Sequence, residues 1–377
     1  MFALRTEDKN GLPVHFSFVI YKTEPISTIE EVFIITKSNI GMKQLRFALI
    51  LLTMLTLASC GGSDDERTPE LIIDPVVELE KPTASTSLTL SNMPVIDGSD
   101  STEPLRSLLV YRLLGIKCQW LQNLHTNATW TIKPMWEELD TDARNSLQRI
   151  LMNRNTHGSF VSLIDSEDDL IITARGISRD EQKYADEKGV ALTSYPIAKD
   201  AFAFIVNPKN PVRNLTIEQI QKIYTGEIRN WKEVGGNDAT INPYIRNANS
   251  GSQEKMETIV MAGLKMIDWP EMVGYVMLSP YFQLEQDENG IAYTPFYYYD
   301  TIVNDDRTQV IGVNGVEPSK KTIENGTYPY ITEVMASVRT DTNKSSTTYQ
   351  LFYQLATGQH NAIIKESGYS VIDHAGR

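Results

Sequence analysis

Cysteine and histidine are scarce in this sequence of 377 residues. Its two cysteines, Cys60 and Cys118, lie far apart, which excludes a disulfide-rich scaffold and a cysteine-based zinc site. The five histidines show no metal-ligand spacing, and no G-x-S-x-G motif marks a hydrolase nucleophile. We therefore expect no bound metal, no cofactor and no catalytic residue, and we interpret the chain as a non-enzyme.

Positive charge is also in deficit. The chain carries 35 Lys and Arg against 48 Asp and Glu, for a net charge of −13. This balance argues against a nucleic-acid surface, which needs clustered basic side chains, but it permits a small local anion site. The hydrophobic content of 41% is typical of a globular protein, and the length suggests roughly two domains.

No hydrophobic run is long enough to span a bilayer, which takes about 20 residues. The longest, Phe47–Ala58, follows the basic residues Lys43 and Arg46 and indicates a secretory signal. Its end, Leu57-Ala58-Ser59-Cys60, resembles the lipobox of bacterial lipoproteins, which implies a lipid anchor on Cys60. The acidic residues 61–66 resemble the surface-export signal of Bacteroidetes lipoproteins, so the anchored protein is expected in the cell envelope, facing the periplasm or the cell surface.

These features divide the N-terminal part of the chain. We predict an upstream, non-native start over 1–41, a lipoprotein signal peptide over 42–59 and a flexible tether over 60–92. From Met93 onward, short apolar runs alternate with helical patterns, which predicts an α/β fold. Asp169–Thr173, Ala201–Val206, Gln309–Val313 and Ile331–Val338 are predicted strands. Capping boxes at Ser178 and Thr216 and an apolar face over Ser345–Thr357 predict helices.

Three segments carry anion-binding chemistry. Ser99, Asp100 and Ser101 stand between a strand end and a helix, where free N–H groups favour an anion. Arg246 precedes the loop Ser250-Gly251-Ser252, which also opens a helix. Arg175 directly follows a predicted strand. Taken singly, the first segment favours ordinary helix capping, and Arg175 equally suits a solvated loop charge.

Together with their neighbours, these segments resemble phosphate-binding proteins of the PstS type. The hinge strand of that family resembles residues 197–211, and its NLT…NW block resembles residues 214–231. Arg246 with Ser250-Gly251-Ser252 resembles the family's R-x-x-x-S-G-T loop, with Ser in place of Thr. Residues 290–293 and 314–329 resemble two later blocks, so the likeness covers about 93–377.

The resemblance implies a type II periplasmic-binding-protein fold, in which two α/β lobes joined by two hinge crossings close on one oxyanion. One lobe would comprise 93–198 plus 309–377 and the other 199–308. The implied ligand is inorganic phosphate, held by the residues of the three segments together with Ser159. The implied partner is the permease of an ABC importer, and we expect a monomer.

One departure from the family concerns selectivity. Arg175 stands where the best-known members place an Asp that accepts the proton of hydrogen phosphate. We hypothesise that Asp100 takes over this acceptor role and forms a compensating pair with Arg175 around the anion. Alternatives are a surface lipoprotein for oxyanion scavenging, sensing or adhesion, and a phosphatase-like enzyme with His157 as its acid or base. Tyr297-Tyr298-Tyr299 suits core packing better than a sugar platform.

Overall fold

The computed structural model describes residues 2–7, 13–18, 79–123, 129–268 and 270–373. The chain divides into two units, Met1–Glu66 and Arg67–Arg377. In the first unit, β1 (Phe2–Glu7) pairs antiparallel with β2 (Pro13–Phe18). The predicted signal peptide and Cys60 lie outside the described residues. In the described part of the chain no helix is both long and apolar enough to cross a membrane.

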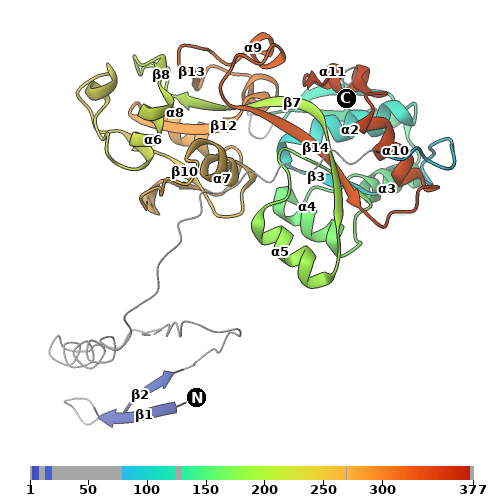
Figure 1. Cartoon of the computed structure of the whole chain (residues 1–377), viewed down its shortest axis with the longest axis horizontal. Coiled ribbons are helices and arrows are strands. Elements are labelled where there is room, and N and C mark those ends of the chain that lie inside the picture. The colour runs from blue at the N-terminus through green and yellow to red at the C-terminus, as the bar shows by residue number, and fades with distance from the viewer. Residues whose placement is uncertain (1, 8–12, 19–78, 124–128, 269, 374–377) are drawn as a thin grey trace. The chain divides into compact units, whose positions relative to one another are not determined.

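One long strand organises the second unit. β7 (Leu192–Val206) is central to a sheet of nine strands among the described residues. Its first part pairs with β14 and β15, and its second part, Phe202–Val206, pairs with β12 and β13. β7 therefore belongs to two groups of elements, which we call lobe 1 and lobe 2. Figure 1 shows the two groups on either side of β7 and β14.

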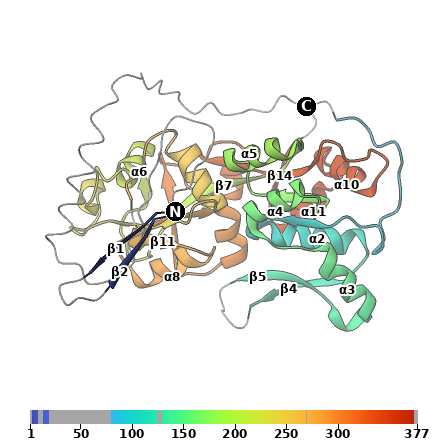
Figure 2. The ribbon, with the colours of Figure 1, turned by 90° about the horizontal axis from the view of Figure 1, so that it is seen from below.

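Lobe 1 contains the N-terminal and C-terminal elements of this unit. In chain order it has β3 (Ile96–Gly98), η1 (Asp100–Thr102), α2 (Glu103–Leu113), β4 (Cys118–Gln122), β5 (Trp130–Pro134), η2 (Trp136–Glu138), α3 (Thr141–Ile150), α4 (Asn155–Ile164), β6 (Leu170–Thr173), α5 (Arg179–Lys188), β14 (Ile331–Arg339), α10 (Thr347–Ala356), α11 (Asn361–Ser367) and β15 (Ser370–Val371). β3 and β6 run parallel, and β4 and β5 form a hairpin beside α3 (Figure 2).

Lobe 2 contains the elements between β7 and β14. In chain order it has β8 (Asn214–Leu215), α6 (Ile217–Tyr224), η3 (Trp231–Val234), β9 (Asn242–Pro243), β10 (Ile245–Arg246), α7 (Gly251–Lys255), η4 (Met256–Val260), η5 (Pro270–Met272), β11 (Val273–Gly274), α8 (Ser279–Gln286), β12 (Gly290–Pro295), η6 (Tyr298–Val303), β13 (Gln309–Val313) and α9 (Lys320–Glu324). The π-helix η4 follows α7 without a break.

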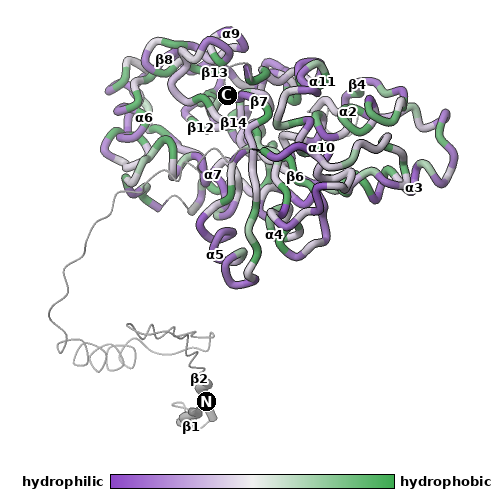
Figure 3. Tube along the Cα trace, turned by 45° about the vertical axis from the view of Figure 1, so that its right-hand side comes forward, coloured by the Kyte–Doolittle hydropathy of each residue, from purple (hydrophilic) through white to green (hydrophobic). Residues whose placement is uncertain are grey.

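The local sequence signals explain the helix boundaries. Ser178 and Glu181 form the predicted capping box of α5, which ends at Gly189 with a φ of 67°. Thr216 caps α6 in the same way. In Figure 3, α5 is coloured as largely hydrophilic, as expected for an outer helix. The same figure shows hydrophobic colour along β6, as expected for a buried strand. The predicted strands and these two helices are therefore confirmed, except that the strand predicted over Ala201–Val206 is only the end of β7, which begins at Leu192.

Two boundaries differ from the sequence predictions. β13 pairs with β8 and with the second part of β7, so the chain returns to lobe 1 after α9 and not at 309. The predicted tether extends to residue 92, but part of it is packed. The backbone N–H of Thr86 donates to Gln350 Oε1 (2.7 Å), and Tyr349 on α10 donates to the carbonyl of Glu80 (2.8 Å). Non-local strand pairing and docking onto α10 decide both boundaries.

Gly98 is the tightest point of the lobe 1 sheet. A Cβ added there would lie 1.8 Å from the carbonyl oxygen of Ile172 on β6. We predict that Gly98→Ala lowers the free energy of unfolding by about 2–4 kcal/mol, because β3 must move away from β6. Urea denaturation measures this loss. Gly176→Ala is the matched control, since a Cβ added at Gly176 would meet no other part of the protein within 4 Å; equal stability of the two variants would contradict the prediction.

Candidate functional site

The first predicted anion segment lies at the end of β3. Ser99 is buried, and its hydroxyl accepts from the N–H of Ala174 (2.9 Å) and shares a hydrogen bond with Thr156 Oγ1 (2.7 Å). The carbonyl of Ser101 accepts from Tyr369 (3.0 Å). Ser99 therefore ties together β3, α4 and the segment after β6, and its hydroxyl is already shared between two protein groups.

A buried arginine beneath this segment holds it in place. Arg106 on α2 is 1% exposed and donates to the carbonyl of Ser99 (3.2 Å) and to Asn153 Oδ1 (2.7 Å). Its charge is balanced by Asp97, 3.6 Å away. The apolar helical pattern around Arg106 gave no signal for this role, because which side of α2 faces β3 is decided by packing.

The second segment presents a buried cation. Arg246 is 6% exposed, its Nε donates to the carbonyl of Gly274 (3.0 Å), and its Nη1 contacts the sulfur of Met277 (3.2 Å). None of the ion pairs among the described residues includes it. Burial lowers the pKa of Arg246. A buried guanidinium without a carboxylate partner is costly, so a bound anion would stabilise this side chain strongly.

The loop after Arg246 is held by its own side chains. Ser250 caps α7 by accepting from the N–H of Gln253 (3.2 Å), while Gln253 Oε1 accepts from the backbone N–H of Arg246 (3.0 Å). The Tyr293 hydroxyl is within 3.0 Å of that same N–H. Ser252 is buried. Arg246, Ser250, Gly251 and Ser252 therefore form one compact group, as the sequence predicts; Gln253 and Tyr293 support it and were not predicted.

The two lobes touch at this point. A Cβ added to Gly251 in lobe 2 would lie 2.8 Å from Thr156 Oγ1 in lobe 1. Thr156 in turn bonds to Ser99. The structure thus brings Ser99 and Gly251 together through Thr156, although their positions in the chain are far apart. A side chain at Gly251 would require the hydroxyl of Thr156 to move.

Thr156, and not Ser159, is the hydroxyl that α4 presents to this contact. Ser159 is fully buried and donates to the carbonyl of Thr156 (2.9 Å) within its own helix. Ser159 lies almost one turn further along α4, where its hydroxyl bonds back to the helix instead of reaching the loop. The sequence stretch Thr-His-Gly-Ser contains both hydroxyls, and only the starting point of α4 distinguishes them.

Arg175 occupies a different environment from the one expected. Its guanidinium forms two hydrogen bonds of 2.8 Å with the carboxylate of Glu181 and lies over the ring of Phe160, 5.5 Å from the centroid. His157 Nδ1 is 3.1 Å from the same carboxylate. The structure therefore gives Arg175 a buried carboxylate partner, while its Nε has no hydrogen-bond partner among the described residues. Arg175 and His157 therefore share the carboxylate of Glu181.

The surroundings of Glu181 lower the pKa of its carboxyl group. Burial alone would raise the pKa of Glu181, but hydrogen bonds and charge from Arg175, the Ser178 N–H and His157 hold it below its usual value. The hydrogen bond of Glu181 with the N–H of Ser178 was predictable from the sequence, because Glu181 is the third helical residue of the predicted capping box. The sequence could not show that the same carboxylate also faces back toward Arg175.

Asp100 faces arginines other than Arg175. Its carboxylate accepts from Asn153 Nδ2 (3.2 Å). Burial raises the pKa of Asp100, while the charges of Arg106 and Arg246 oppose this effect. The hypothesis of a compensating Asp100–Arg175 pair is therefore replaced by one in which Asp100 acts together with Arg246.

The other residues considered in the sequence have structural surroundings. Tyr297 and Tyr298 are buried, which agrees with packing. Cys118 is half-buried on β4, and burial raises the pKa of its thiol. Among the described residues no group of three or more His, Cys, Asp or Glu side chains could hold a metal ion.

The sequence model described as "PBP superfamily domain" matches residues 165–357, a little over half of the chain. The phosphate-binding protein PstS of Staphylococcus epidermidis is 26% identical over 227 residues, covering 57% of this chain and 67% of the relative.

Solved structures show the same fold. An ABC-type phosphate transport receptor from Vibrio cholerae is similar with a TM-score of 0.52 and 22% identity, covering 74% of this chain and 99% of the other. A putative phosphate ABC transporter substrate-binding protein with bound phosphate from Clostridium perfringens gives the same four values. The predicted two-lobe fold is therefore confirmed.

We predict that Arg175→Met destabilises the protein by about 3–5 kcal/mol at neutral pH, because Glu181 would be left buried and unpaired. Chemical denaturation measures the loss. It should shrink as the pH falls below the usual carboxylate range, because the stability that the lowered pKa of Glu181 provides is lost on protonation.

Exposed Arg179 on α5 supplies the control, and Arg179→Met should leave stability nearly unchanged. A folded Arg175→Met variant of wild-type stability would show that the Glu181 pair has no structural importance.

Proposed function

This chain belongs to the PBP superfamily, and we propose that it binds inorganic phosphate between its two lobes as the substrate-binding protein of an ABC-type phosphate importer. The observation that carries this proposal is Arg246, a buried guanidinium without a carboxylate partner among the described residues, beside the point where the lobes meet. The named relatives, which are phosphate-binding proteins, support phosphate as the anion.

The surrounding donors suit a small tetrahedral oxyanion. The hydroxyls of Ser101, Thr156 and Ser252 come from both lobes, and the guanidinium of Arg246 supplies charge. An anion that contacts both lobes favours the closed arrangement by its differential contacts. Phosphate fits this set because charge-assisted hydrogen bonds from fixed donors satisfy its oxygens with little help from water.

Asp100 gives this site a means of selection. In our proposal its carboxylate accepts the proton of a protonated oxyanion, while Arg246 binds the charged oxygens. Fully deprotonated sulfate has no proton to donate to Asp100. Its oxygen would face the carboxylate oxygen with no hydrogen bond between them, which is unfavourable in a buried site. The raised pKa of Asp100 agrees with a carboxylate surrounded by little solvent.

We further propose that the protein is a monomer anchored in the cell envelope through lipid on Cys60, where it delivers phosphate to a permease. The hydrophobic segment before Cys60 supports export, and the 19 residues 60–78 are long enough to act as a spacer between the lipid and the packed residues from 79 onward. No enzymatic step is needed for this function.

We predict that titration calorimetry of the chain starting at Cys60, with Cys60→Ser to avoid lipidation, shows saturable phosphate binding. Arg246→Met should weaken it by about a hundredfold, because the buried cation and its hydrogen bonds are lost. Arg179→Met is the control with unchanged affinity. Absence of phosphate binding by the unsubstituted protein would refute the proposed function.

For Asp100, we predict that Asp100→Asn narrows the preference for phosphate over sulfate by about tenfold or more, because the proton acceptor is removed and a negative charge disappears. Competition titrations with the two anions measure the ratio. Asp142→Asn on the exposed face of α3 is the control. An unchanged ratio would leave Asp100 only its hydrogen bond with Asn153.

A further inference from the structure

A buried lysine connects the anion loop of lobe 2 with the hinge. Lys255 is the last residue of α7, three positions after Ser252, and is 3% exposed. Its Nζ donates to Thr332 Oγ1 on β14 (3.1 Å). Thr332 lies opposite Asp200 in the pairing of β14 with β7. The lysine therefore begins beside the anion loop and ends where the two crossing strands meet.

Asp200 supplies the opposite charge at this point. It is 2% exposed, and its Oδ1 accepts from the N–H groups of Ala201 (2.7 Å) and Tyr297 (2.9 Å). Its Oδ2 has no hydrogen-bond partner in the described part of the chain. A buried carboxylate in this state depends on a nearby cation. The charges of Lys255 and Asp200 act on each other, and Thr332 links them, because it accepts from Lys255 and lies opposite Asp200.

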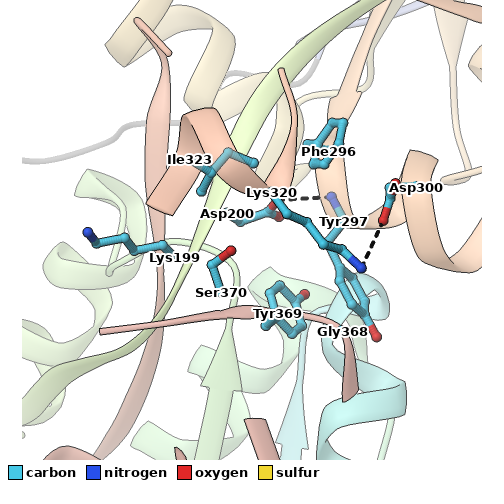
Figure 4. Close-up of a pocket in the computed structure, with 10 residues that line it drawn as sticks. All are labelled: Lys199, Asp200, Phe296, Tyr297, Asp300, Lys320, Ile323, Gly368, Tyr369 and Ser370. Atoms are coloured by element: carbon cyan, nitrogen blue, oxygen red, sulfur yellow. Dashed lines mark hydrogen bonds and ion pairs between the residues drawn. The ribbon is translucent and has the colours of Figure 1, made fainter. Parts of the chain in front are cut away.

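These contacts continue to the anion segment of lobe 1. The ring of Tyr297 stacks on Tyr369, with centroids 3.7 Å apart and planes inclined by 11°. Tyr369 donates to the carbonyl of Ser101 (3.0 Å). Figure 4 shows Asp200, Tyr297 and Tyr369 around a small pocket at the hinge. A continuous set of contacts therefore leads from Ser101 in lobe 1 to Lys255 in lobe 2.

Few charges compete for Asp200. Lys199 extends away from the pocket in Figure 4, and Lys320 pairs with Asp300 (3.3 Å). The positive charge of Arg175 lowers the pKa of Lys255, although Arg175 is itself paired with Glu181. Lys255 is therefore the cation that this geometry assigns to Asp200.

We propose that Lys255 is a positioning residue for the anion site: held by Thr332 and Asp200, its ammonium group keeps the loop Ser250-Gly251-Ser252 against Thr156 when the lobes are closed. This inference rests on the proposed phosphate binding. Removal of the amino group would leave Asp200 without this nearby cation and would remove the hydrogen bond between α7 and β14. The closed arrangement would then be less populated, and ligand affinity would fall accordingly.

The charge of Lys255 should make phosphate affinity depend on pH. Burial lowers the pKa of Lys255 to about 8, against an opposing effect of Asp200 and with a further lowering by Arg175. Because a bound anion nearby favours the charged ammonium group, phosphate binding should take up a proton, and phosphate affinity should fall as the pH rises through about 8. Stability of the unliganded protein should respond in the opposite direction. Because the folded form binds fewer protons than the unfolded form above about pH 8, this group adds stability as pH rises toward the ordinary lysine pKa.

The experiment is phosphate titration calorimetry of the full chain starting at Cys60, from pH 7 to 10. Lys255→Met should bind about tenfold more weakly at pH 7 and lose the fall in affinity near pH 8. Lys255→Arg should retain affinity at pH 7 and also lose that fall, because its charge persists. Lys222→Met, on the exposed face of α6 in the same lobe, is the control. Ionisation of phosphate itself is common to all variants and cancels in the comparison.

Asp200→Asn provides a second test that does not need a folded Lys255 variant. Removing the carboxylate takes away the effect that raises the pKa of Lys255, so the fall in affinity should move to lower pH. A purely structural role would change stability without moving this profile. Wild-type binding with identical profiles in all variants would overturn the proposal for Lys255. Failure of the wild type itself to bind phosphate would instead refute the proposed function.

Discussion

The structure depends on one strand that both lobes share. β7 pairs with β14 and β15 in lobe 1 and with β12 and β13 in lobe 2, so neither sheet is complete without it. Any movement between the lobes must then be taken up within β7 and at the start of β14. The register between these two strands shifts between Val334 and Met335, opposite Pro196, which has no N–H to donate. This irregularity lies close to the point where Asp200 and Thr332 meet.

Buried charge explains why the site lies where it does. Three arginines are buried near the lobe contact, and two have carboxylate partners: Arg106 has Asp97 and Arg175 has Glu181. Arg246 has none in the described part of the chain. Paired arginines hold loops in place, whereas an unpaired one creates a demand for an anion. In a chain of net charge −13, the proposed anion binding depends on local, directed donors and not on overall attraction.

Local sequence signals identify some residues of the candidate site and miss others. Arg246, Ser250, Gly251 and Ser252 lie within seven consecutive residues, so their grouping follows from local chain geometry, and the sequence sufficed. Ser99 was selected for the same local reason, beside a strand end and a helix start, and its place in the anion site stays a prediction. Thr156 and Lys255 were missed because their roles depend on contacts between segments far apart in the chain. The partner of Arg175 could not be predicted, because it depends on how α5 folds back onto the strand end.

By itself, the sequence determined several elements: capping boxes set the starts of α5 and α6, and apolar runs set β6 and β13. It also determined the fold class and the local anion loop. These are short-range properties, set by hydrogen bonds and burial within a few residues. Only the tertiary structure decided which hydroxyl meets Gly251, which buried arginine lacks a carboxylate among the described residues, and which lysine reaches the hinge. Those outcomes depend on how two lobes pack around one strand, because electrostatic pairing in a protein interior is decided by proximity in space.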